Sequence, residues 1–218
     1  AGTSVTIAEW EAIVSYFERE APDTLTGAGP TATPRADLSL FSVRAPQWSP
    51  TEPPATVLVK VDPTARHIYY TDALTETTYR TDQTLASSTA FQPGQVGVDL
   101  QFVRDEATDG RHVIGTSIGT MRAIDNANGS VWDLNLRTDS SRTLASGLPR
   151  PVCSRPGDFN SDGLRDWIVC GFGHTRGGLY LLEQQPDRTF SKQVLRGMAG
   201  AVDVQVGDFN GDGYPDVM

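Results

Sequence analysis

The first hydrophobic pattern along the chain has the period of an α-helix. In the segment IAEWEAIVSYFERE, residues 7–20, apolar side chains recur every three or four positions, which places them on one helix face. Thr6 stands just before this segment and Glu9 follows three positions later, which is the spacing of a capping box. Pro22 disfavours helical geometry at the residue before it. The pattern therefore predicts one helix over residues 7–20.

The pattern changes twice after this helix. Residues 26–54 are rich in Pro, Gly, Ala, Thr and Ser, which indicates a connector with at most one strand, Leu38–Val43. Beyond it, short β-branched and aromatic runs alternate with Gly, Asn, Asp and Pro, as in antiparallel strands joined by turns. We predict a helical segment over 1–25, either separate or the tail of a preceding domain, the connector over 26–54 and a β domain over 55–218.

The β domain contains a repeat. Each unit has a strand, a turn centred on an Asp and a second strand that ends in small residues. Periods of about 40–50 residues are typical of β-propeller blades, which stack around an axis. The predicted fold class is mainly β: propeller blades of four-stranded antiparallel sheets in an incomplete ring, with an N-terminal α-helix. Four units do not close a ring, so we expect the last blade to pack against further sequence beyond Met218. The turns are centred on Asp62, Asp105, Asp158 and Asp208.

The last two units carry an acidic loop with the pattern D-x-N-x-D-G-x-x-D. This alternation turns the odd-numbered groups toward one point, where oxygen ligands suit a hard cation, and Ca2+ fits best. Gly at position 6 permits a sharp turn, and the carbonyl group at position 7 adds an oxygen, as in EF-hand loops. The predicted ligands are Asp158, Asn160, Asp162, the Leu164 carbonyl and Asp166 in the first loop, and Asp208, Asn210, Asp212, the Tyr214 carbonyl and Asp216 in the second.

The acidic loops differ from an EF-hand, and they have a metal-free alternative. Position 12 of the first loop is Val169 where an EF-hand has Glu, and strands rather than helices flank the loop. Asp and Asn also favour turns without any ion, so plain hairpin turns are the alternative. We expect calcium to stabilise the turns rather than to take part in catalysis. The turns at Asp62 and Asp105 lack the pattern, and no calcium is expected there.

The loops Asp158–Asp166 and Asp208–Asp216 resemble the FG-GAP/VCBS repeat, the calcium-loop blade of integrin α-subunit propellers and of many secreted bacterial proteins. The VCGFG segment after the first loop stands where that family places the small-residue end of a strand. The resemblance covers residues 150–218 well and 55–150 weakly, and it implies a calcium-binding propeller. The predicted helix also resembles a segment that follows a haem-binding cytochrome c motif in some bacterial proteins with these repeats. The chain has no C-x-x-C-H motif, so we expect no haem in it.

Composition narrows the partners and the location. The chain has 18 Lys and Arg against 27 Asp and Glu, a net charge of −9, which argues against nucleic acid or an anionic membrane surface as partner. No apolar run of the roughly 18 residues needed for a transmembrane segment occurs. Calcium sites of millimolar-range affinity stay filled at extracellular concentrations. We therefore expect a secreted, periplasmic or cell-surface protein.

The cysteine and histidine residues are further candidates for functional sites. Cys153 and Cys170 stand symmetrically about the first acidic loop, so a hairpin would place them within reach of a disulfide, with a free buried pair as the alternative. His67 and His112 stand at equivalent places in their units, which favours packing or solvent exposure over acid–base or metal chemistry. Trp10 and Trp167 are expected in the core.

The sequence lacks the common catalytic motifs. It contains no G-x-S-x-G, no G-x-x-x-x-G-K-[ST] and no H-E-x-x-H, and we predict no catalytic and no organic-cofactor residues. The predicted function is a non-catalytic binding or adhesion module for a protein or carbohydrate ligand. The alternative is a polysaccharide lyase-like enzyme, or part of a haem-containing redox protein, with its site in the propeller funnel. Convergent His, Tyr, Arg or carboxylate groups at the axis would favour the enzyme.

Overall fold

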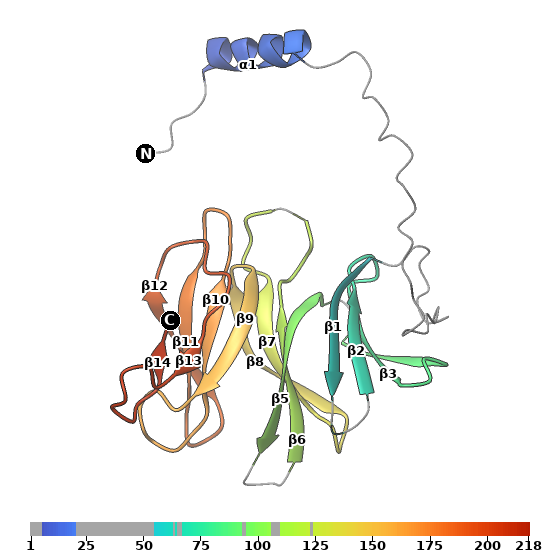
Figure 1. Cartoon of the computed structure of the whole chain (residues 1–218), viewed down its shortest axis with the longest axis vertical. Coiled ribbons are helices and arrows are strands. Elements are labelled where there is room, and N and C mark those ends of the chain that lie inside the picture. The colour runs from blue at the N-terminus through green and yellow to red at the C-terminus, as the bar shows by residue number, and fades with distance from the viewer. Residues whose placement is uncertain are drawn as a thin grey trace, which may run out of the picture. The chain divides into compact units, whose positions relative to one another are not determined.

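The computed structural model describes residues 6–20, 55–62, 64, 67–92, 95–105, 110–122 and 124–218 (Figure 1). The chain divides into two compact units, residues 1–44 and 45–218, and each is described by itself. The predicted connector over 26–54, with its expected strand Leu38–Val43, lies outside the described residues.

Helix α1 spans Ile7–Glu20, as predicted. The capping box is present: Glu9 N–H donates to Thr6 Oγ1 over 3.3 Å, and Thr6 N–H donates to Glu9 Oε2 over 2.8 Å. The Thr6 N–H and the Thr6 hydroxyl both donate to the Glu9 carboxylate, and these two bonds lower the pKa of Glu9 because they stabilise its ionised form. No α1 side chain is buried by the described residues. Trp10 is 61% exposed, so its predicted place in a core is wrong: no described residue of its own unit covers that face of α1.

The second unit consists of successive antiparallel sheets, three of four strands and one of two (Figure 1). The first sheet contains β1 (Thr56–Asp62), β2 (His67–Asp72), β3 (Thr77–Asp82) and β4 (Ser88–Gln92). The second contains β5 (Gly97–Asp105), β6 (Gly110–Ser117), β7 (Gly129–Asn135) and β8 (Ser140–Leu148). The third contains β9 (Pro151–Gly157), β10 (Asp166–Gly171), β11 (Gly178–Gln184) and β12 (Phe190–Arg196), and the last β13 (Val206–Gly207) and β14 (Asp216–Val217).

The strands of each four-stranded sheet pair in chain order. Each sheet is therefore an antiparallel meander, as expected of a propeller blade. The four predicted Asp-centred turns fall in the first hairpin of each sheet: β1–β2, β5–β6, β9–β10 and β13–β14. The mainly β fold class with an N-terminal helix and incomplete propeller-like blades is thus confirmed.

Apolar side chains from neighbouring sheets form shared cores. Leu58 and Tyr69 of the first sheet pack with Leu100 and Trp132 of the second. A second cluster joins the second and third sheets; its buried members are Ile114, Val131, Leu148, Trp167, Val169, Tyr180 and Leu182. Burial of these faces supplies the main favourable free energy of stacking. The prediction that Trp167 belongs to the core is confirmed, because its side chain is 2% exposed.

A row of paired charges crosses the first strands of successive sheets, where β1 contacts β5, β5 contacts β9, and β9 contacts β13. We call Lys60, Asp99, Arg155 and Asp203 the charge ladder. Lys60 Nζ lies 3.7 Å from Asp99 Oδ1. Arg155 Nη1 lies 2.6 Å from Asp99 Oδ2, and Arg155 Nη2 lies 2.7 Å from Asp203 Oδ1. Asp99 is 8% exposed at its side chain, so its charge is compensated by the neighbouring repeats.

Candidate functional site

The first acidic loop folds its side chains back onto its own backbone. It joins β9 to β10, and the N–H group of Asp162 donates both to Asp158 Oδ1 and to Asn160 Oδ1, each over 3.1 Å. Gly163 N–H donates to Asp158 Oδ2 over 3.0 Å. The Asn160 side-chain amide also donates to Asp162 Oδ2 over 2.8 Å. The side chains at positions 1, 3 and 5 are therefore gathered around one turn.

The second acidic loop repeats these contacts at the same offsets. Asp212 N–H donates to Asp208 Oδ1 over 3.1 Å and to Asn210 Oδ1 over 2.9 Å. Gly213 N–H donates to Asp208 Oδ2 over 2.9 Å. Backbone donors, Gly213 first, lower the pKa of Asp208 because they stabilise its ionised form. The bonds among positions 1, 3, 5 and 6 therefore recur in both loops, so this part of the turn has the same conformation.

Two positions of each loop have left-handed backbone conformation. At position 6, φ is +80° at Gly163 and +86° at Gly213, which only Gly adopts without strain. At position 4, φ is +62° at Ser161 and +79° at Gly211. The first loop therefore has a non-Gly residue in a conformation that costs about 1–2 kcal/mol.

The closing carboxylates fix the loops to the sheets. Asp166 accepts from Phe159 N–H over 3.1 Å and from Gln184 N–H, at the end of β11, over 2.8 Å. It is buried, with an exposed fraction of 0%, and this burial raises the pKa of its carboxyl group because the charged form is desolvated. Asp216 is half-buried and accepts from Phe209 N–H over 2.9 Å. The first loop is therefore tied to one strand more than the second.

The chemistry of the acidic loops fits a hard cation. The side-chain groups that could bind a metal ion are oxygens of Asp and Asn. The carbonyl groups of Leu164 and Tyr214 stand at position 7 of the two loops. Within the described ranges, no group of three His, Cys, Asp or Glu side chains is close enough to hold a metal ion as it stands. The ten predicted ligands thus lie in two turns that share the hydrogen bonds from position 5 to positions 1 and 3. Calcium binding by these residues stays a prediction.

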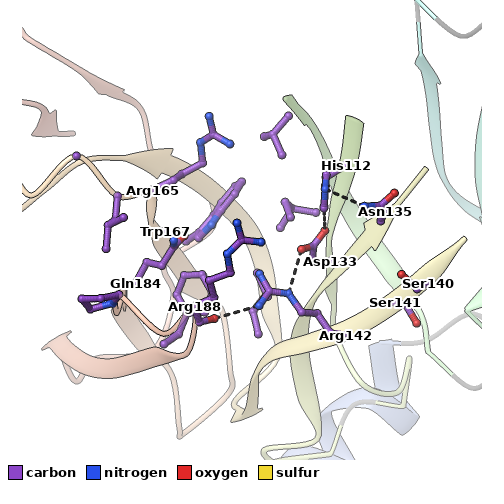
Figure 2. Close-up of a pocket in the computed structure, with 17 residues that line it drawn as sticks. His112, Asp133, Asn135, Ser140, Ser141, Arg142, Arg165, Trp167, Gln184 and Arg188 are labelled. Carbon is purple, nitrogen blue, oxygen red and sulfur yellow. Dashed lines mark hydrogen bonds and ion pairs between the residues drawn. The ribbon is translucent and has the colours of Figure 1, made fainter. Parts of the chain in front are cut away.

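A pocket of about 730 Å³ adjoins the first acidic loop (Figure 2). Residues of β6, β7 and β8 line one side of it, and residues of β10, β11 and β12 line the other. Gly163, Leu164 and Arg165 bring the acidic loop into its wall. The pocket therefore lies between the second and third sheets, in contact with the candidate metal loop.

The second-sheet side of the pocket holds a hydrogen-bonded polar cluster. His112 Nδ1 lies 2.6 Å from Asp133 Oδ1, and His112 Nε2 lies 3.3 Å from the Asn135 side-chain amide (Figure 2). Arg142 Nε donates to Asp133 Oδ2 over 3.2 Å. The two ring nitrogens of His112 are thus both hydrogen-bonded within the protein, Nδ1 with Asp133 and Nε2 with Asn135. Asp133, 7% exposed at its side chain, fixes both His112 and Arg142.

Guanidinium groups dominate the charge of the pocket wall. Arg142, Arg165 and Arg188 line the pocket, and among the described lining residues Asp133 is the one carboxylate. Arg142 Nη1 donates to the carbonyl of Arg188 over 3.0 Å, so it joins the two sheets. Arg165 Nη1 donates to the carbonyl of Arg104 over 3.0 Å. A locally basic pocket therefore occurs in a chain of net charge −9.

The sequence did not predict this pocket, because the position of His112 favoured packing or solvent exposure over a functional site. Its equivalent, His67, is half-buried and His174 is exposed, and neither lines the pocket. Asp133 and Asn135 stand two positions apart on one strand, and His112 pairs with Asn135 on the adjacent strand. This spacing could have indicated that the three side chains lie on the same face of the sheet. Nothing in the sequence indicates which residues of the next sheet would face them, because that depends on sheet packing.

The two cysteines lie where the hairpin interpretation placed them. Cys153 of β9 pairs directly with Cys170 of β10, and both are buried free thiols in this structure. The hydrogen bond between them and their burial raise the pKa of the Cys153 thiol. This corresponds to the free buried pair that was the alternative to a disulfide.

The C-terminal part of the chain matches a known repeat family. Residues 158–218 match the model of a family described as FG-GAP-like repeat. The match begins at the first residue of the first acidic loop and includes all of the second, so it confirms the resemblance based on these loops. A comparison with curated proteins finds no match. Among the described helices, none is long and apolar enough to cross a membrane.

Proposed function

We propose that this chain is part of a calcium-stabilised β-propeller that serves as a non-catalytic binding module of an exported protein. One observation carries the proposal. Two acidic loops in successive repeats have the same candidate oxygen ligands and share the hydrogen bonds from position 5 to positions 1 and 3, within a segment that matches the FG-GAP-like repeat. Each loop has carboxylates at positions 1, 5 and 9. Three carboxylates on one turn, with an Asn between the first two, are the oxygen ligand set of a calcium site rather than that of a plain Asx turn.

Each loop would hold one calcium ion through its own oxygens. In this proposal the ligands are Asp158, Asn160, Asp162, the Leu164 carbonyl and Asp166, and Asp208, Asn210, Asp212, the Tyr214 carbonyl and Asp216. The ion supplies positive charge where three carboxylates per loop would otherwise repel one another. The chain contributes the turn: Gly163 and Gly213 permit the reversal, and Asp166 fixes its loop to β11.

Two features favour binding over catalysis. The charged groups on the first strands are paired with one another in the charge ladder, so they hold sheets together rather than converge on a substrate. The His112 ring in the pocket has Asp133 on Nδ1 and Asn135 on Nε2. Because both ring nitrogens are engaged, His112 is not placed as a general base. Both features support a binding role over a catalytic one.

The proposal predicts that calcium raises the melting temperature. Binding to the folded state alone stabilises by about 2.7 kcal/mol per site when free calcium is one hundred times Kd. Thermal unfolding of the chain should therefore shift upward in saturating calcium and downward in excess chelator. Asp158→Ala should remove the contribution of the first loop.

Asp187→Ala is the matched control for this experiment. Asp187 forms an Asx turn with Thr189 in the β11–β12 hairpin, with hydrogen bonds of 3.0 and 2.6 Å, but it belongs to no repeated acidic loop. Its replacement should leave the calcium-induced shift intact. Identical melting curves of the unmodified chain in calcium and in chelator would contradict the proposed function.

A further inference from the structure

The pocket between the second and third sheets has the size and lining of a small-molecule site. Its volume of about 730 Å³ lies within the range of about 300–1,000 Å³ typical of ligand pockets. The half-buried Phe190 contributes aromatic surface, and the polar residues of the wall come from both sheets. A single inorganic ion would occupy only a small part of this space.

The guanidinium groups of the pocket retain hydrogen-bonding capacity. A guanidinium group has five N–H donors in a planar fork that matches an oxyanion. The described contacts of Arg142 use its Nε and one Nη1 donor, and that of Arg165 uses one Nη1 donor. Arg188 is exposed at the pocket wall. The remaining donors can bind a carboxylate group of a ligand.

Arg188 occupies a strained backbone position. Its φ is +66°, in the turn between β11 and β12, where Gly or Asn is the usual residue. An Arg in this conformation costs about 1–2 kcal/mol, and such outliers indicate function when a site is present. Here the strained residue lines the basic pocket, and its carbonyl accepts from Arg142 across the two sheets.

Neutral polar side chains surround the guanidinium groups. Ser140 and Ser141 at the start of β8, Asn135 of β7 and Gln184 of β11 line the same pocket. Hydroxyl and amide groups both donate and accept hydrogen bonds, as the hydroxyl groups of a sugar require. The wall thus combines sites for a carboxylate, for several hydroxyl groups and for an apolar ring face.

We propose that this pocket binds an acidic saccharide, with its carboxylate on Arg142, Arg165 and Arg188 and its hydroxyl groups on the Ser, Asn and Gln side chains. The inference rests on the proposed binding function and assigns its ligand class and its location. It differs from an inorganic oxyanion site, which would use the guanidinium groups alone.

The test is calorimetric titration with three probes in calcium-containing buffer of low ionic strength. Digalacturonate should bind, and galactobiose, the matched neutral disaccharide, should bind at least about tenfold more weakly, because it lacks the groups that guanidinium recognises. Inorganic phosphate is the third probe. Phosphate binding without digalacturonate binding would overturn the saccharide assignment.

The decisive variant is Arg188→Gly. Gly adopts the left-handed turn without strain, so the melting temperature should stay the same or rise, while digalacturonate affinity should fall at least about tenfold. Arg196→Ala removes a charge from β12 outside the pocket and should leave the affinity unchanged. Equal affinities of the Arg188→Gly variant and the unmodified chain would contradict the proposal.

The outcome separates this inference from the proposed function. If digalacturonate does not bind but calcium still raises the melting temperature, the ligand class is wrong and the calcium-stabilised module stands. If calcium has no effect on melting and digalacturonate does not bind, both are wrong.

Discussion

At the residue scale, position 4 of the acidic loops shows how sequence and strain are related. The two loops share the hydrogen bonds that the position-5 N–H group donates to positions 1 and 3, but Ser161 occupies in the first the left-handed position that Gly211 occupies in the second. A Cβ atom added at Gly211 would meet no atom within 4 Å. The cost of a side chain there is therefore conformational rather than steric, and it acts in both loops alike.

This comparison predicts opposite effects of two exchanges. Ser161→Gly should raise the free energy of unfolding by up to about 1 kcal/mol, because relief of left-handed strain exceeds the added entropy of the unfolded chain. Gly211→Ser should lower it by a similar amount. Urea denaturation in excess chelator measures both without a contribution from calcium. A destabilised Ser161→Gly variant would show that the Ser161 side chain contributes contacts that outweigh its strain.

At the element scale, the hairpins that contain the acidic loops differ in how they are supported. The first loop joins strands of seven and six residues, β9 and β10, and its Asp166 also accepts from Gln184 of β11. The second joins β13 and β14, of two residues each. Fixing one more residue costs about 1–2 kcal/mol. The second loop must meet this cost from its binding free energy, so the first loop should bind calcium about tenfold more tightly.

The element scale also shows how far the sequence could predict the structure. Helix α1 and the Asp-centred hairpins follow local rules, a capping box and turn residues between β-branched runs, and these were predicted. The exposed Trp10 and the pocket around His112 were not, because both depend on which surfaces pack together. The role of Arg188 could not be predicted either. Its place in the pocket wall depends on the packing of β12 beside β8, which no local pattern in the sequence indicates.

At the scale of the whole molecule, the charge ladder connects all four repeats. Asp99 is buried between Lys60 of the first sheet and Arg155 of the third, and Arg155 also reaches Asp203 before β13. Apolar packing between the sheets supplies stability without direction. The ladder adds specific pairing between neighbouring sheets, and Arg155 makes the shorter of the two ionic contacts to the buried Asp99.

Arg155→Ala should therefore be strongly destabilising. Removing one partner of a buried ion pair costs up to about 3–5 kcal/mol, and without Arg155 the buried Asp99 keeps only the more distant Lys60, at 3.7 Å, as a cationic partner. Lys60→Ala is the matched control: Lys60 is 43% exposed at its side chain and 3.7 Å from Asp99, so its loss should cost less than about 1 kcal/mol. Urea denaturation measures the free energy of unfolding of both variants. Equal decreases would show that Arg155 stabilises the sheets no more than Lys60 does.

Calorimetric titration of calcium into the chain and into the Asp162→Ala and Asp212→Ala variants measures whether the two acidic loops bind calcium and which of them binds it more tightly. The unmodified chain should bind two calcium ions, Asp162→Ala should lose the tighter site, and Asp212→Ala should lose the weaker one. Absence of calcium binding, or loss of the tighter site in Asp212→Ala, would contradict the account.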